Sequence, residues 1–170
     1  MKWITSAILA FSVLFSANVI AADTMVIVVR HAEKSTDDSK DPNLSEQGNI
    51  RAVKLAAVLK DASLKAVYTT QYKRTQQTGQ PSATLAGLQL EVRPTTKENA
   101  ETYTSGLLKE IQKKHRDKTV LIVGHSNTVS DIVKHITGSA VEAIADNEFD
   151  RIYVIMLGKK PRLVALSYDP

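Results

Sequence analysis

The chain has no cysteine and few aromatic residues, which make up 5% of its 170 positions. Without cysteine the protein has no disulfide framework, no lipid-modified cysteine and no thiolate nucleophile, so a hydrophobic core must supply its stability. Low-complexity tracts, internal repeats and linkers are also absent, which excludes a disordered or repeat architecture. With 43% hydrophobic and 24% charged residues, the composition is that of one ordinary globular domain.

Neither positive nor negative charge predominates strongly in the sequence. Lysine and arginine number 22 against 18 aspartate and glutamate residues, which gives a net charge of +4, and the two signs are scattered. No basic stripe of the kind that binds a nucleic acid is visible. We therefore expect no nucleic-acid partner, although a pI near 9.2 favours anionic substrates.

The first residues form a segment of a different kind. Lys2 precedes an apolar run over residues 3–20, and two alanines follow just before Asp23. A short positive region, an apolar stretch and small residues at its end are typical of a secretory signal peptide. The pattern predicts a cleaved signal peptide over residues 1–22, a mature domain over 23–170, and a periplasmic or secreted protein without stable membrane insertion. The alternative is an uncleaved membrane anchor, because the apolar run approaches spanning length.

Beyond this segment, strand and helix patterns alternate. Strands are expected over residues 24–29, 66–69, 89–92, 119–123, 151–157 and 163–167. Helices are expected over residues 45–60, 74–85, 102–115 and 128–137. Such alternation predicts an α/β fold, a single domain with a mainly parallel sheet and helices on both faces. In the first helix, the helical period places Val53, Ala56, Ala57 and Leu59 toward the core, and Arg51, Lys54 and Lys60 outward.

Polar clusters follow three of these strands. Arg30 and His31 come directly after the first strand, and the Gly-His pair that ends in His125 comes directly after the strand over 119–123. Arg74 opens the helix that follows the second strand, where a cation is electrostatically unfavourable unless an anion is held there. Ligands bind beyond the carboxyl ends of parallel strands, so two histidines and two arginines converge on one expected crevice. Each cluster alone is weak evidence, because a histidine after a strand is more often structural than catalytic.

Four short blocks, in this order along the chain, resemble the signatures of the histidine phosphatase superfamily, branch 1. They are Arg30–Glu33, Asn43–Gly48, Val67–Thr78 and Leu121–Ser126. The resemblance implies a phosphoglycerate mutase-like fold. It also implies a phosphoric monoester hydrolase that acts on phosphomonoesters or phosphohistidine without a metal or cofactor. Ala32 departs from the glycine that is usual in the family, and Gln71-Tyr72 departs from the common Pro-Leu.

The resemblance also implies a role for each residue of the crevice. His31 attacks phosphorus and becomes a phosphohistidine, which divides hydrolysis into two easier steps. Arg30 and Arg74 bind the phosphate oxygens with their forked donors. His125 adds a donor or charge as the transition state develops.

The resemblance also implies a general acid for the leaving group, supplied by a carboxylate from the segment after the third strand. Glu98 is the first candidate and Glu101 the second, and either could instead be an ordinary solvated carboxylate. Some small phosphohistidine phosphatases of this family resemble enzymes without such an acid, because phosphohistidine has a good leaving group. Glu33 either orients a group of the site or faces solvent.

The sequence leaves other functions open. A phosphoglycerate mutase-like phosphotransferase would need an insertion over its substrate, for which the mature chain has no room. A catalytically inactive phospho-ligand-binding protein would need the arginines but not His31. A metal site on the two histidines lacks a His-x-x-x-His or carboxylate-rich pattern. The substrate is expected to be a phosphorylated small molecule or an envelope glycolipid, and the oligomeric state is not predicted.

Overall fold

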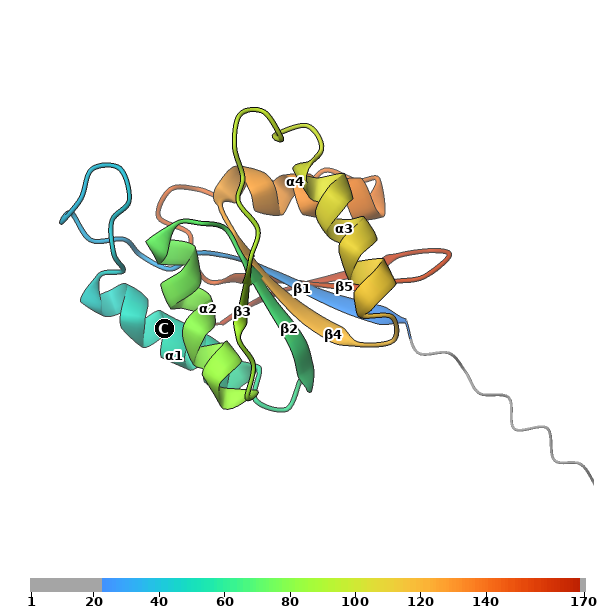
Figure 1. Ribbon diagram of the computed structural model, residues 1–170, viewed down its shortest axis with the longest axis horizontal. Helices are drawn as coiled ribbons and strands as arrows, with labels where there is room; N and C mark the ends of the chain where they lie inside the picture. Colours follow the sequence, from blue (N-terminus) through green and yellow to red (C-terminus); the bar gives the residue numbers. More distant parts are fainter. Residues whose placement is uncertain (1–22, 169–170) are drawn as a thin grey trace, which may run out of the picture.

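Strands and helices alternate along residues 23–168, the part of the chain that the computed structural model describes (Figure 1). The strands are β1 (Thr24–Arg30), β2 (Leu64–Thr69), β3 (Leu90–Val92), β4 (Thr119–Gly124), β5 (Arg151–Leu157) and β6 (Arg162–Ser167). The helices are α1 (Glu46–Val58), α2 (Lys73–Leu85), α3 (Tyr103–Lys114) and α4 (Ser126–Thr137). The predicted signal peptide over residues 1–22 lies outside the described residues.

The strand order places β4 and β1 at the centre of one sheet, with the order β3-β2-β4-β1-β5-β6. β1 pairs in parallel with β4, β4 with β2, and β2 with β3. β5 and β6 form an antiparallel hairpin beside β1. The expected α/β fold with a mainly parallel sheet is therefore confirmed, and the antiparallel part is limited to one side of the sheet.

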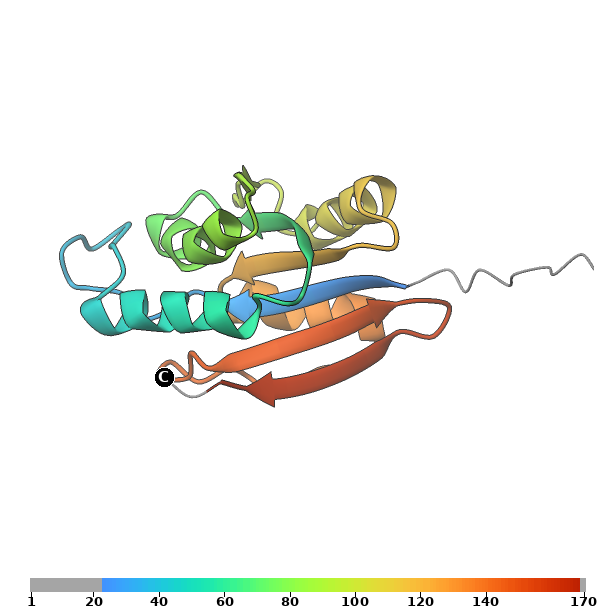
Figure 2. The same ribbon diagram turned by 90° about the horizontal axis from the view of Figure 1, so that it is seen from below.

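Apolar side chains of β1 alternate between the two faces of the sheet, because successive residues of a strand point to opposite sides. Ile27 and Val29 pack against α1 and α2. Val26 and Val28 pack against α3 and α4 on the other face. The helices cover both faces, as expected, and Figure 2 shows α1 (teal) in front of the sheet and α4 (orange) behind it.

The buried face of α1 differs from the expectation. Arg51 is buried, with 6% of its surface exposed, whereas Val53 is 61% exposed. Ala57 also faces solvent. The predicted directions of these three side chains were wrong, because Arg51 turns inward to an ion pair with Glu33 at 2.7 Å. The spacing of apolar residues along the helix cannot predict such an ion pair.

Helix α4 begins at Ser126 rather than at the predicted Thr128. His125 directly precedes the helix, and its backbone N–H donates to the Thr128 hydroxyl at 2.7 Å. This contact replaces a helical hydrogen bond that the first turn lacks. The helix ends as predicted at Gly138, whose φ of 73° is left-handed. His125 is thereby fixed between a central strand and a helix start.

The first turn of α1 lies against the backbone of Glu33. Ser45 caps the helix by accepting a hydrogen bond from the Gly48 N–H at 3.1 Å. Its own N–H donates to the Glu33 carbonyl at 2.9 Å. A Cβ at Gly48 would lie 2.2 Å from that carbonyl oxygen. Only glycine allows this approach, which holds the segment that follows His31 in place.

We predict that Gly48→Ala lowers the free energy of unfolding by at least about 1–3 kcal/mol, as expected when a group is forced into occupied space. Gly106→Ala is the matched control, because a Cβ on this helical glycine meets nothing within 4 Å. Alanine there should stabilise the protein by roughly 0.5–1 kcal/mol. Urea unfolding followed by circular dichroism measures both changes. Equal stability of the two variants would contradict the close approach.

Candidate active site

A cavity of about 760 Å³ opens beyond the carboxyl ends of β1, β2 and β4. The side chains at its wall are mostly basic or aromatic. They include Arg30, His31, Lys34, Tyr72, Arg74, Lys97, His125 and Phe149. The cavity therefore lies at the edge of the sheet where the strand-end clusters predicted a crevice, and it holds both histidines and both arginines.

The pairing of β1 with β4 brings the two histidines together. Arg30 lies opposite Gly124 in the register of these strands. His31, the residue directly after β1, donates its backbone N–H to the Gly124 carbonyl at 2.9 Å. The ring centroids of His31 and His125 are 5.4 Å apart, in an edge-to-face arrangement. Both imidazoles therefore face one small volume of the cavity.

His31 is buried and is held in one tautomer. Its Nδ1 lies 2.7 Å from the Ala32 carbonyl oxygen, which can only accept a hydrogen bond, so Nδ1 carries the proton. The lone pair of Nε2 is then free. Burial lowers the pKa of His31 to about 4, and the charges of Arg74 and Arg30 act in the same direction. At neutral pH the ring is an uncharged imidazole with one available nucleophilic nitrogen.

His125 is held in the opposite tautomer. The Arg74 guanidinium lies 3.4 Å from Nδ1 and can only donate, so this nitrogen accepts. The proton is then on Nε2, which donates to the Thr70 hydroxyl at 3.0 Å. Thr70 is itself buried and lies 2.9 Å from the Thr75 hydroxyl. Burial lowers the pKa of His125 to about 3, with the Arg74 charge as the next cause.

Arg30 is fixed by backbone carbonyls of the segment before β5. Its Nη1 donates to Ala145 at 2.7 Å and to Glu148 at 2.9 Å. The Phe149 ring lies under the guanidinium, 4.3 Å from its centre. Burial lowers the pKa of Arg30, which Asp146 and Glu148 oppose, and the buried Nε has no partner among the described residues. The guanidinium is thus held rigidly beside His31 with donor capacity left over.

Arg74 lies in the first turn of α2 and stacks on Tyr72, 4.4 Å from the ring centre. The Arg74 guanidinium forms an ion pair with the Asp41 carboxylate at 3.8 Å. Ser126 and Asn127 from the first turn of α4 also line the cavity. Two helix N-termini and two arginines therefore surround the histidines, an arrangement that favours a multiply charged anion such as phosphate.

Comparison with known families agrees with this geometry. The model of the histidine phosphatase superfamily (branch 1) matches residues 26–104, which contain Arg30, His31 and Arg74. The first part of the described chain is therefore similar to this superfamily. His125 lies beyond the matched residues and joins the site through the pairing of β1 with β4.

Several solved structures share the fold of this protein. Mycobacterial glucosyl-3-phosphoglycerate phosphatase with inorganic phosphate is 15% identical, with a TM-score of 0.67, over 85% of this chain and 97% of that chain. The protein histidine phosphatase SixA with tungstate is 17% identical, with a TM-score of 0.67, over 84% and 96%. Phosphoserine phosphatase from Entamoeba histolytica with 3-phosphoglyceric acid is 14% identical, with a TM-score of 0.65, over 86% and 98%. These likenesses confirm the phosphoglycerate mutase-like fold. No curated protein matches the sequence significantly.

The two general-acid candidates lie outside the cavity wall. Glu98 is exposed, although Thr96 and Lys97 of the same loop line the cavity. A hydrogen bond from the Thr96 side chain lowers the pKa of Glu98, which disfavours its protonated form. Glu101 is exposed and lines a separate cavity. Among the described residues, Asp146 is the carboxylate that lines the cavity with the histidines. The acid role of Glu98 stays a prediction.

Glu33 was expected either to orient a group of the site or to face solvent, and it does neither. Its carboxylate pairs with Arg51 through Nε and Nη2 at 2.7–2.9 Å. It therefore ties the segment after His31 to α1 and does not contact the reacting groups. This pair lowers the pKa of Glu33 despite partial burial.

Three residues of the site carried little signal in the sequence. Thr70 could have been suspected only from its place at the end of β2. Phe149 and Asp146 reach the site from the segment between α4 and β5, which has no motif of its own. Among residues 23–168, no group of three or more histidine, aspartate or glutamate side chains could hold a metal ion.

We predict that the pKa of His31 makes stability depend on pH. In the folded protein the ring stays neutral down to about pH 4, whereas an unfolded histidine takes up a proton below about pH 6.5. The contribution of His31 to the free energy of unfolding is therefore fully present above pH 6.5. It decreases as the pH drops toward 4, by up to about 1.4 kcal/mol per pH unit. Urea unfolding of the wild type and of His31→Gln, at neutral pH and near pH 5, measures the difference. The same pH dependence in both proteins would mean that His31 titrates normally.

Proposed function

We propose that this protein is a phosphomonoester hydrolase that works through a phosphohistidine on His31. The observation that carries the proposal is the state of that ring. It is neutral, its Nδ1 proton is engaged by the Ala32 carbonyl, and its free Nε2 lies among cations in an open cavity. A neutral imidazole with a free lone pair is the form that attacks phosphorus.

The first chemical step transfers the phosphoryl group to the enzyme. The Nε2 lone pair of His31 forms a bond to phosphorus while the bond from phosphorus to the leaving oxygen breaks. Arg30 and Arg74 hold the phosphoryl oxygens, and His125 stabilises the charge that spreads over them. The leaving oxygen takes a proton from Glu98, from another carboxylate or from water.

The second step returns the enzyme to its starting state. Water enters the open cavity and its oxygen attacks phosphorus, while the bond between phosphorus and Nε2 breaks. The attacking water loses a proton to the group that protonated the leaving oxygen, inorganic phosphate leaves, and His31 is again a neutral imidazole. The positive charge for both steps comes from side chains, so the reaction is proposed to need no metal.

The proposed substrate is a phosphorylated small molecule with further anionic groups. The names of two solved relatives, glucosyl-3-phosphoglycerate phosphatase and phosphoserine phosphatase, favour this class. Lys34 and Lys97 line the cavity beyond the arginines and form no ion pair within residues 23–168, so each can receive an additional negative charge. An envelope glycolipid is the alternative substrate.

We also propose that the protein is exported to the periplasm or beyond. Support comes from the lysine, apolar run and paired alanines at the beginning of the chain. None of the helices in the described part of the chain is both long and apolar enough to cross a membrane.

His31 is predicted to become phosphorylated during turnover of an aryl phosphate. Because a phosphoramidate bond is labile in acid, the enzyme is denatured in alkali and the labelled peptide is mapped by mass spectrometry. The label should lie on the peptide that contains Arg30 and His31, in the presence of EDTA as well as without it. His31→Ala should show neither label nor hydrolysis. His125→Ala should lose roughly 10²–10³-fold in rate, as expected for loss of one transition-state donor, and still label slowly.

A label on Ser126, or full hydrolysis by His31→Ala, would overturn this mechanism. Binding of phosphate by the wild type without any hydrolysis would indicate the inactive phospho-ligand-binding protein. Loss of activity in EDTA that a divalent ion restores would make the histidines metal ligands.

The general acid is tested with two substrates that differ in leaving group. If Glu98 protonates the leaving oxygen, Glu98→Gln should slow an alkyl phosphate by up to about 10²–10⁴-fold and an activated aryl phosphate much less. Glu101→Gln and Asp146→Asn are the matched variants. A selective loss in one of these would transfer the role to that residue. Equal effects on both substrates would assign Glu98 to binding or structure.

A further inference from the structure

The sheet edge opposite the active site is formed by three segments that are far apart in the sequence. The start of β1, the turn between α3 and β4, and the turn between β5 and β6 meet there (Figure 1). Thr24 pairs with Leu157, and its hydroxyl accepts a hydrogen bond from the Asp117 N–H at 3.0 Å. The Met25 N–H donates to the Lys118 carbonyl at 2.9 Å. These contacts fix the three segments relative to one another.

Exposed cations gather on this edge. The basic edge, as we call it, consists of Lys109, Lys113, Arg116, Lys118, Lys159, Lys160 and Arg162, all of which are exposed. None of them forms an ion pair within residues 23–168. Asp23 and Asp117 line the neighbouring cavity together with Lys109 and Arg116. Glu110, which lies between Lys109 and Lys113 on α3, is paired with Arg93 and Lys114.

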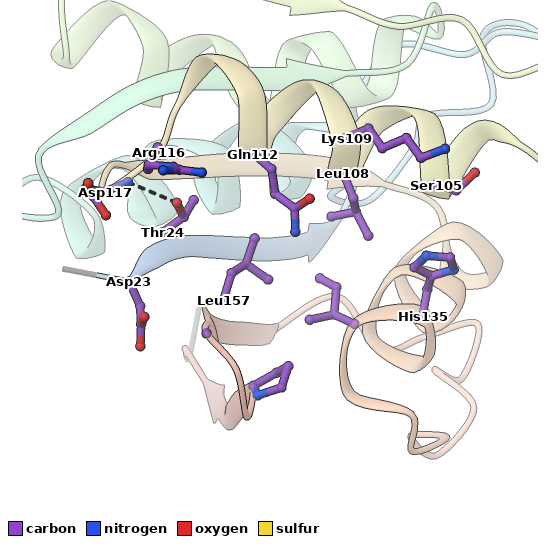
Figure 3. Close-up of a pocket in the computed structure, with 13 residues that line it drawn as sticks. Asp23, Thr24, Ser105, Leu108, Lys109, Gln112, Arg116, Asp117, His135 and Leu157 are labelled. Carbon is purple, nitrogen blue, oxygen red and sulfur yellow. Dashed lines mark hydrogen bonds between the residues drawn. The ribbon is translucent and has the colours of Figure 1, made fainter. Parts of the chain in front are cut away.

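The basic edge also has a cavity whose wall is partly apolar and partly polar. A cavity of about 730 Å³ lies between α3, α4 and the β5–β6 hairpin (Figure 3). Its apolar wall includes Leu108, Ile136 and Leu157, and cations such as Lys109 and Arg116 line it as well. Apolar surface beside lysine and arginine is the combination found on proteins that lie at a bilayer interface.

The charge of the basic edge identifies the occupant. Because the protein is proposed to be exported, the anionic surface that it meets is a lipid bilayer. Lysine and arginine are attracted to anionic lipid headgroups, and this attraction acts within about one Debye length, roughly 8–10 Å.

We propose that the basic edge docks on an anionic bilayer surface and holds the active-site cavity away from it. The two edges are separated by the length of β1, which spans Thr24–Arg30 and so extends roughly 20 Å at the rise of a strand. The cavity with His31 then opens to water. This orientation deepens the proposed function, because it selects water-soluble phosphorylated substrates over phosphate groups in the plane of the lipid headgroups.

The docking is tested by flotation of the full chain with vesicles. One vesicle type contains phosphatidylglycerol and phosphatidylcholine in equal parts, and the other is pure phosphatidylcholine. Binding should be at least about 10-fold stronger to the anionic vesicles, and the excess should disappear at about 1 M salt, where the Debye length is about 3 Å. Lys109→Gln/Lys113→Gln/Arg116→Gln should weaken anionic binding by roughly 10–100-fold, because each cation near the surface contributes separately.

The control variant is Lys40→Gln/Lys54→Gln/Lys73→Gln, which removes the same charge from other elements and should keep wild-type binding. Equal binding of all proteins to both vesicle types would mean that the apolar run alone inserts, and would overturn the proposal. So would tighter binding to duplex DNA than to anionic vesicles, which would indicate a nucleic-acid partner.

The orientation has its own measurement, which also separates this inference from the proposed function. Hydrolysis of a soluble aryl phosphate should have the same kcat/KM with and without anionic vesicles, for the wild type and for the Lys109/Lys113/Arg116 variant. A large loss of kcat/KM on vesicles would place the cavity against the bilayer and overturn the orientation. An absence of hydrolysis in solution would count against the proposed function, whereas vesicle binding is measured without it.

Discussion

The parallel pairing of β1 with β4 is the interaction on which the site depends. Its register sets Arg30 opposite Gly124, so that the residues that follow, His31 and His125, leave the sheet side by side. One histidine continues the ladder of a central strand through its own N–H, and the other begins α4. Neither lies on a free loop. Transfer of a phosphoryl group requires this fixed geometry, because the nucleophile and the donors must be aligned with phosphorus before reaction.

Burial beside arginines gives the two histidines their chemical state. Removal from water disfavours the imidazolium of each ring, and the charge of Arg74 disfavours it further, which lowers the pKa of both. The hydrogen-bond partners then select the tautomers: Ala32 engages Nδ1 of His31, whereas Thr70 engages Nε2 of His125. The same cations that keep the rings neutral also attract the phosphate. One arrangement of charge therefore prepares the nucleophile and binds its target.

A parallel sheet also separates the two ends of the molecule. Strands β1 to β4 all begin at one edge and end at the other, so the loops at their carboxyl ends form the cavity while the opposite edge is free for a different use. The antiparallel hairpin adds its turn to that opposite edge, beside the start of β1. Lysines and arginines from α3 and from this turn thereby meet in space, although the sequence scatters them among acidic residues.

Local patterns in the sequence determined the order of strands and helices, the α/β class, and the convergence of Arg30, His31, Arg74 and His125 on one edge. Apolar runs, helix starts and strand-end clusters are properties of neighbouring residues, so they can be recognised without the fold. Only the tertiary structure decided that Arg51 is buried, that segments without a motif complete the cavity wall, and that the expected acids lie outside it. Those outcomes depend on contacts between residues distant in the chain, whose energies outweigh the local preference of any single side chain.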